Sequence, residues 1–214
     1  KKMGIFGGTF DPVHMGHLRA AEEFAETMEL DRVLILPSAV PPHREDPPAA
    51  SAGDRLEMLR LAVKSNKRLE VSDLELRRPG PSYTLDTVEQ IRTRQGPVEI
   101  FLALGADAYA EIATWHRPDE ILSLVHVVVL TRPGFTVDLP GPLPEDVRVK
   151  YEKRGDILVS AVRTTIRPLA VTDMDISASR IRRLVGSGRS IRYLVPEGVS
   201  RYIREKGLYA GSVR

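Results

Sequence analysis

The stretch GGTFDPVHMGH, residues 7 to 17, determines how the rest of the chain is interpreted. It follows a short apolar run at residues 3 to 6, which predicts a first strand. It precedes residues 18 to 28, where apolar side chains recur at helical spacing. In an open parallel sheet, ligands gather at the carboxyl ends of the strands, and a helix N-terminus attracts phosphate. The sequence therefore predicts a phosphate-binding turn between the first strand and the first helix.

The residue types in this turn favour a polyphosphate ligand. Gly7 and Gly8 lack side chains, so backbone can approach a phosphate closely. His14 and His17 are spaced i, i+3, so both rings can face one ligand and donate hydrogen bonds to phosphoryl oxygens, neutral or protonated. A solvated helix start is the alternative for such a pair, and a zinc site lacks a nearby third ligand. The chain has no G-x-x-x-x-G-K-[ST] and no G-x-G-x-x-G, which argues against P-loop hydrolysis and dinucleotide reduction.

Strand-like and helix-like segments alternate along the chain, which predicts an α/β fold: a Rossmann-like, doubly wound parallel sheet with a small C-terminal helical subdomain. We expect one domain at residues 1–175, with an irregular excursion and a small strand at 136–175, and a helical subdomain at 176–214. The expected strands are 3–6, 33–36, 69–76, 98–104 and 126–131, and the expected helices include 54–66, 84–93, 107–113, 177–185 and 197–206.

Composition excludes several classes of protein. The 214 residues contain no Cys, so disulfide scaffolds, thiolate metal sites and cysteine nucleophiles are ruled out. Lys and Arg number 31 against 29 Asp and Glu, which disfavours nonspecific nucleic-acid binding, although residues 177 to 206 are locally basic and suit an anion. The longest uncharged apolar stretch, 121 to 131, is too short to span a bilayer. We expect a cytoplasmic protein with neither membrane nor nucleic acid as a partner.

Two segments resemble signatures of one enzyme superfamily. GGTFDPVHMGH is similar to the nucleotidyltransferase signature that ends in (H/T)xGH, and ISASRIR, residues 176 to 182, is similar to the second signature, ISSTxIR. PPHR at 41 to 44, PSYTLDT at 81 to 87 and GADAYAEIATWH at 105 to 116 resemble the bacterial nicotinate-nucleotide adenylyltransferases. The resemblance spans most of the chain.

The resemblance implies an enzyme that joins the AMP part of ATP to nicotinate mononucleotide, giving nicotinate adenine dinucleotide and pyrophosphate in NAD synthesis. It implies Mg²⁺ on the phosphates, with no metal ligands from side chains, and it is compatible with a homo-oligomer. No covalent intermediate is needed, so catalysis is positioning plus charge stabilisation. The alternatives are an adenylyltransferase for nicotinamide mononucleotide, another nucleotidyltransferase of this superfamily such as a cytidylyl-type relative, a non-catalytic nucleotide-binding regulator, and a nucleic-acid binder. The intact His pair disfavours the regulator, and the near-zero net charge disfavours the nucleic-acid binder.

On the ATP side, the resemblance implies catalytic roles for His14, His17 and Arg182. Ser177, Ser179 and Arg182 open a predicted helix, where hydroxyls, a guanidinium and N–H groups suit β and γ phosphates. The family more often has Ser-Thr where this chain has Ala-Ser, so one hydroxyl is missing, and an ordinary capped helix is the alternative. The expected ATP-binding residues are Gly7, Gly8, Thr9, Phe10, His14, His17, Asp107, Ser177, Ser179 and Arg182.

On the mononucleotide side, the resemblance implies that Trp115 stacks on the pyridine ring, with a place in the core as the alternative. N–H groups near Ser82 to Thr84 would favour the nicotinate carboxylate over a carboxamide. Arg44 stands where the family commonly has Lys, which keeps the charge and changes the donor geometry. The expected residues are Gly8, Thr9, Arg44, Ser82, Tyr83, Thr84, Trp115 and Arg132. The roles of His43 and His116 stay open, Asp107 has helix capping as its alternative, and His126 is expected to be structural.

Overall fold

The structure is a computed structural model that describes residues 1–39, 47–78, 80 and 82–211. The chain divides into two compact units. Unit 1 comprises Lys1–Phe6, Glu23–Val33 and Tyr83–Val171, and unit 2 comprises Gly7–Glu22, Leu34–Ser82 and Thr172–Arg214. These units are defined by contacts and do not follow the expected domain boundary at residue 175. That domain boundary stays a prediction.

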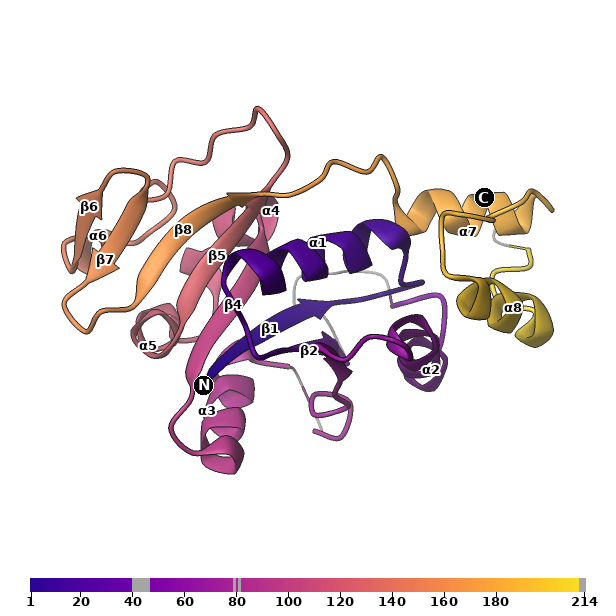
Figure 1. The fold of residues 1–214 in the computed structure, drawn as a ribbon, viewed down its shortest axis with the longest axis horizontal. Coiled ribbons are helices and arrows are strands. Elements are labelled where there is room, and N and C mark those ends of the chain that lie inside the picture. Colours follow the sequence, from indigo (N-terminus) through magenta and orange to yellow (C-terminus); the bar gives the residue numbers. More distant parts are fainter. Residues whose placement is uncertain (40–46, 79, 81, 212–214) are drawn as a thin grey trace. The chain divides into compact units, whose positions relative to one another are not determined.

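Parallel β-strands form the core of unit 1. Strand β1 pairs in parallel with β4, β4 with β5, and β5 with β8, as Figure 1 shows. The central strands are runs of Val, Ile, Leu and Phe because both faces are covered; Val127, Val128 and Val129 are fully buried. The predicted α/β fold with a parallel sheet is confirmed. The strands are β1 (Lys2–Gly8), β2 (Arg32–Pro37), β4 (Glu99–Gly105), β5 (His126–Thr131) and β8 (Thr165–Ala170), and β1 and β2 end in unit 2.

The segment 136–175 holds more strand than the sequence predicted. Instead of one small strand, it contains β6 (Tyr151–Arg154), β7 (Ile157–Ser160) and β8. Strands β6 and β7 form an antiparallel hairpin, and β7 also pairs antiparallel with β8. Strand β8 was missed because Pro168 interrupts its pattern, although its partner β5 supplies the pairing.

Helices and one close approach complete unit 1. A Cβ atom at Gly4 would lie 2.7 to 2.9 Å from side chains of Phe24, Leu30 and Val33, so β1 needs glycine there. Helix α3 packs against α5. The expected helix at 107–113 is two short pieces, since the backbone tightens after Ala110. The elements are α3 (Thr84–Gln95), α4 (Ala106–Ala110), the 3₁₀ turn η1 (Ile112–Thr114), α5 (Pro118–Leu124) and α6 (Glu145–Arg148).

Unit 2 contains the C-terminal ends of β1 and β2 beside β3, with helices from both ends of the chain. The Ser38 N–H donates to the Gly8 carbonyl at 3.0 Å, and the Ser72 N–H donates to the Ile35 carbonyl at 3.0 Å. The prediction of a strand to residue 76 is wrong beyond Val71, because Asp73 starts a turn. The elements are α1 (Met15–Thr27), which ends in unit 1, α2 (Ala52–Val63), β3 (Leu69–Val71), α7 (Ala178–Gly186) and α8 (Glu197–Lys206). The predicted C-terminal helices are confirmed.

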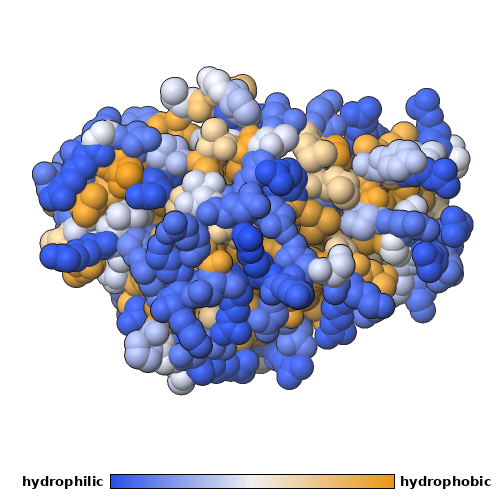
Figure 2. Space-filling view, in the orientation of Figure 1, coloured by the Kyte–Doolittle hydropathy of each residue, from blue (hydrophilic) through white to orange (hydrophobic). Residues whose placement is uncertain are grey.

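The surface is mixed in character. On the face drawn in Figure 2, hydrophilic side chains cover most of the area and apolar ones lie in small groups among them. Such mixing is ordinary for a globular protein surface. Within the described ranges, every helix falls short of the length and apolar character that a membrane crossing requires.

Candidate active site

The turn at residues 7–14 of unit 2 is held in one conformation by Phe10. Phe10 is 2% exposed and its φ is 52°, a left-handed value that a bulky residue rarely adopts. A Cβ atom at Gly8 would lie 2.9 Å from the Phe10 ring, whereas one at Gly7 would meet open space. Gly8 is therefore required by packing inside the turn, and Gly7 leaves the backbone open to a ligand.

The two histidines are stacked and hold each other through the backbone. The rings of His14 and His17 lie 3.6 Å apart at 22°. The His14 N–H donates to Nδ1 of His17 at 3.3 Å, and the His17 N–H donates to Nδ1 of His14 at 3.4 Å. Because each Nδ1 accepts a hydrogen bond, the proton of each neutral ring lies on Nε2. The pair therefore offers two Nε2–H donors.

Burial keeps both rings neutral at physiological pH. It lowers the pKa of His14 from its ordinary 6.5 to about 4. It lowers the pKa of His17 to about 3, with repulsion from His14 as a second cause. The sequence left the protonation state open, and the structure favours neutral donors. A Cβ atom at Gly16 would lie 3.2 Å from Nδ1 of His14, so the glycine of the motif makes room for this ring.

The first turn of α1 contributes rings rather than amides. The Met15 N–H donates to the Leu194 carbonyl at 2.9 Å, and the His17 N–H donates to the His14 carbonyl at 3.0 Å. These N–H groups already have partners within unit 2. The phosphate donors expected from this helix start are therefore the two imidazoles.

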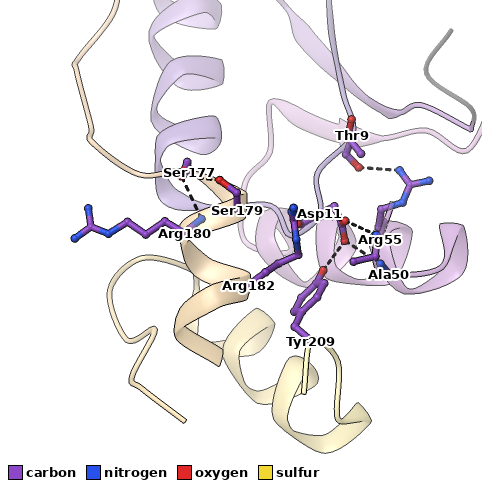
Figure 3. A network of polar contacts seen from close by, with 10 residues as sticks. Thr9, Asp11, Ala50, Arg55, Ser177, Ser179, Arg180, Arg182 and Tyr209 are labelled. Carbon is purple, nitrogen blue, oxygen red and sulfur yellow. Dashed lines mark hydrogen bonds and ion pairs between the residues drawn. The ribbon is translucent and has the colours of Figure 1, made fainter. Parts of the chain in front are cut away.

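Asp11 connects the turn to three other segments of unit 2 (Figure 3). Its carboxylate is buried and accepts from the N–H groups of Ala49 and Ala50, at 2.7 and 3.0 Å, and from the Tyr209 hydroxyl at 2.8 Å. Arg182 Nη1 lies 3.8 Å from the same carboxylate and donates to the Asp11 carbonyl at 2.7 Å. One carboxylate thus joins the turn, the segment before α2, helix α7 and the C-terminal segment.

A second arginine is buried beneath the turn. Arg55 of α2 is 1% exposed and donates from Nη1 to the Thr9 carbonyl at 2.7 Å. Burial lowers its pKa, and the charge of Asp11 opposes that shift. The cluster of Asp11, Arg55 and Arg182 holds two guanidinium groups and one carboxylate. One positive charge is left over, which suits an anionic ligand.

Helix α7 begins with the predicted hydroxyls. Ser177 is its N-cap, and the Ser177 hydroxyl oxygen accepts from the Arg180 N–H at 3.2 Å and lies 3.3 Å from the Ser179 hydroxyl. Arg182 is in the second turn of the helix region, with its side chain 26% exposed. These contacts are compatible both with an ordinary capped helix and with phosphate binding, because a serine hydroxyl that accepts from the backbone can still donate.

Five other expected ligands lie in unit 1: Tyr83, Thr84, Asp107, Trp115 and Arg132. The rings of Tyr83 and His116 lie 4.6 Å apart at 33°. Tyr83 precedes α3, and no side chain of the described residues caps that helix. Trp115 follows η1 and is half-buried, so it is not a closed core residue. Thr84 opens α3, Asp107 is in the first turn of α4, and Arg132 is exposed after β5.

The remaining two residues expected to bind the mononucleotide are Ser82 and Arg44. In unit 2, the Ser82 hydroxyl is buried and has no hydrogen-bond partner among the described residues. Arg44, together with Pro41, Pro42 and His43, lies outside the described residues.

His126 in unit 1 has its ring between the Glu99 carboxylate and the Thr165 hydroxyl, at 3.2 and 2.9 Å, which fits the expected structural role.

Sequence reasoning missed Asp11, Arg55 and Tyr209 as parts of the site. Asp11 stands inside the quoted motif but received no role. Arg55 had a readable signal, because it shares the buried face of α2 with Met58, Leu59 and Val63, where a charge needs a partner. Tyr209 had none, since its partner is 198 positions away.

The fold and this turn define a class of protein. Residues 5–184 match the family model described as cytidylyltransferase-like. The turn at residues 7–14, the stacked histidines and the opening of α7 all lie within that range.

Relatives narrow the class. A protein of Pseudomonas syringae named "Probable nicotinate-nucleotide adenylyltransferase" is 45% identical over 98% of this chain and 94% of its own length. A protein of Geobacillus thermodenitrificans with the same name is 41% identical over 97% of this chain and 86% of its own. This chain belongs to the nicotinate-nucleotide adenylyltransferase family.

Solved structures share the fold. The nicotinic acid mononucleotide adenylyltransferase of Plasmodium falciparum complexed with APC has a TM-score of 0.71 at 15% identity, and its complex with NaAD has 0.73 at 16% identity. Both comparisons cover 100% of each chain. The expected Rossmann-like nucleotidyltransferase fold is confirmed.

Proposed function

We propose that this chain transfers the adenylyl group of ATP to nicotinate mononucleotide, giving nicotinate adenine dinucleotide and pyrophosphate. The observation that carries the proposal is the stacked pair of His14 and His17 with both Nε2–H groups available as donors. Family membership indicates the reaction, and the two imidazoles are the hydrogen-bond donors that can stabilise charge on phosphate oxygens during it.

The reaction is a displacement at phosphorus. An oxygen of the mononucleotide 5′-phosphate forms a bond to the α-phosphorus of ATP, and the bond from that phosphorus to the bridging oxygen of pyrophosphate breaks. Negative charge builds on the oxygens around phosphorus. His14 and His17 donate hydrogen bonds to these oxygens without needing to change protonation, since their pKa values lie near 4 and 3.

Arg182, with Ser177 and Ser179, completes the phosphate site. The guanidinium bonds the Asp11 carbonyl through Nη1, which leaves other N–H groups for β and γ phosphate oxygens. Positive charge at this position stabilises the departing pyrophosphate. The enzyme works by placing donors, and no residue of the site forms a covalent bond to the substrate.

Mg²⁺ is proposed to enter with ATP. The donors of the turn are imidazole N–H, hydroxyl and guanidinium groups, which suit phosphate oxygens, whereas Mg²⁺ prefers carboxylates, carbonyls and water. Across the described ranges, no three His, Asp or Glu side chains group as a metal site. An ion carried by the phosphates would neutralise part of their charge.

The preference for nicotinate is assigned to the start of α3 in unit 1. A helix N-terminus carries partial positive charge, which stabilises a carboxylate more than a neutral carboxamide. Tyr83 and Thr84 stand at that N-terminus, and α3 has twelve residues. Trp115, which is half-buried and precedes His116 in sequence, is assigned to stacking on the pyridine ring.

A pyrophosphate-release assay tests the proposal. The chain is given ATP and Mg²⁺ with nicotinate mononucleotide, nicotinamide mononucleotide or phosphopantetheine. We expect release with nicotinate mononucleotide at a kcat/KM at least tenfold above the others. Equal or greater kcat/KM with nicotinamide mononucleotide would support the amide enzyme instead, and release with none of the three would contradict adenylyl transfer to these acceptors.

A further inference from the structure

We propose that Tyr209 is a positioning residue for catalysis: its hydroxyl fixes the Asp11 carboxylate and through it the guanidinium of Arg182. The inference rests on the proposed function for the role of Arg182 in holding phosphates. It assigns a role in the phosphate site to a residue of the C-terminal segment that acts through Asp11.

The contact is buried and specific. The Tyr209 hydroxyl donates to Asp11 Oδ1 at 2.8 Å, and the two residues are 7% and 4% exposed. Burial, together with the charge of Asp11, raises the pKa of Tyr209 far above its ordinary value. The hydroxyl therefore keeps its proton and acts as a permanent donor.

Tyr209 supplies part of what holds the carboxylate in place. Oδ1 of Asp11 accepts from Tyr209 and from the Ala50 N–H at 3.0 Å, and Oδ2 accepts from the Ala49 N–H at 2.7 Å. Removing the hydroxyl leaves a buried charged oxygen with one fewer donor. A buried acceptor without a donor costs free energy, so we expect the carboxylate to rotate toward a guanidinium.

The nearest guanidinium in this arrangement is Arg182. Its Nη1 lies 3.8 Å from Asp11 Oδ2 while it donates to the Asp11 carbonyl at 2.7 Å (Figure 3). A carboxylate that turns to pair with Nη1 draws Arg182 away from the phosphates. Misplacement of a catalytic donor by about 1 Å can lower the rate by up to about 10²-fold.

The same unit offers a matched control. The Tyr202 hydroxyl donates to the Asp54 carboxylate at 2.9 Å, so it is also a C-terminal tyrosine bonded to an aspartate near α2. Among the described contacts, the Asp54 carboxylate pairs with neither Arg55 nor Arg182. Tyr202→Phe therefore removes a tyrosine–aspartate bond of similar length in a less buried setting, without touching the Asp11 cluster.

The experiment compares Tyr209→Phe with Tyr202→Phe in the full chain. We expect Tyr209→Phe to lower kcat about tenfold and to weaken binding of a non-hydrolysable ATP analogue severalfold, with KM for nicotinate mononucleotide within twofold of wild type. Tyr202→Phe should leave all three values within twofold. Melting temperatures of both variants show whether each change in rate follows from lost stability.

A double-mutant cycle with Arg182→Lys tests the route through Arg182. In that background, Tyr209→Phe should change kcat and analogue affinity by less than twofold, because the group that it positions is already altered. Multiplying effects, or equal losses in the two tyrosine variants, would overturn the inference. Analogue binding decides the inference even if the wild type transfers no adenylyl group to nicotinate mononucleotide, which would overturn only the proposed function.

Discussion

The turn at residues 7–14 of unit 2 and the aromatic group of unit 1, which consists of Tyr83, Trp115 and His116, differ in burial. In the turn, Phe10 and His14 are buried and Asp11 accepts three hydrogen bonds on its carboxylate. In the aromatic group, Tyr83 is 36% exposed, His116 is exposed and Trp115 is half-buried. The turn is fixed before any ligand binds, and the aromatic side chains keep accessible faces.

This difference in burial predicts that the two regions control different kinetic constants. Fixed donors around phosphorus stabilise charge without reorganising during reaction, so the turn should control kcat. Accessible aromatic faces gain contact when a ring binds, so the aromatic group should control KM. Variants in each region can separate these effects.

The largest effect is expected from His17→Ala. Loss of one preorganised donor should lower kcat by about 10²–10³-fold, because the charge on the phosphate oxygens loses a hydrogen bond. Steady-state pyrophosphate release measures the change, and circular dichroism checks that the variant folds. An unchanged kcat would remove His17 from the reaction.

Asp11→Asn should have the next largest effect, on stability. It removes the carboxylate charge that opposes the burial of Arg55 and that lies 3.8 Å from Nη1 of Arg182, and breaking a buried ion pair costs about 3–5 kcal/mol. We expect the free energy of unfolding in urea to fall by about 3 kcal/mol. Asp54→Asn is the control and should cost about 1 kcal/mol or less. Equal losses would mean that the Asp11 cluster contributes no special stability.

Trp115→Ala tests the aromatic group. Stacking of an aromatic side chain on a base contributes about 1–3 kcal/mol, so KM for nicotinate mononucleotide should rise about tenfold or more. KM for ATP should stay within about twofold. Varying one substrate at saturating levels of the other gives both constants, and parallel rises would speak against stacking.

A pH dependence of stability tests the burial of the two imidazole rings. The folded pKa values of His14 and His17, about 4 and about 3, lie below the ordinary 6.5. Between these values the unfolded chain binds more protons, so their contribution is complete above pH 6.5 and is lost as pH falls toward 4. Each ring contributes a slope of up to about 1.4 kcal/mol per pH unit.

Urea unfolding at pH 7, 6 and 5 measures this slope. The wild type should lose stability more steeply than the double variant His14→Asn, His17→Asn. Identical slopes would show that the imidazoles ionise in the folded protein as freely as in the unfolded chain.

Local patterns predicted the part of the site that local sequence encodes. The turn at residues 7–17 was found because its glycines and histidines stand between one strand and one helix. The protonation state of His14 cannot be predicted from local sequence, because burial by residues distant in the chain determines it. The role of Tyr209 cannot be predicted either, because its bond to Asp11 joins opposite ends of the chain.

The fold was predicted in outline and missed where pairing overrides pattern. The central strands are continuous apolar runs, so their sequence identifies them. Strand β8 contains Arg167 and Pro168 and exists because β5 lies beside it. The expected cytoplasmic location stays a prediction, and the sequence is compatible with a homo-oligomer without predicting one.

A crystal structure with a non-hydrolysable ATP analogue tests the central claim most directly. The account predicts phosphate oxygens within hydrogen-bond distance of Nε2 of His14 and His17, with Arg182 on the outer phosphates. A triphosphate bound elsewhere, with both Nε2 atoms facing solvent, would contradict it.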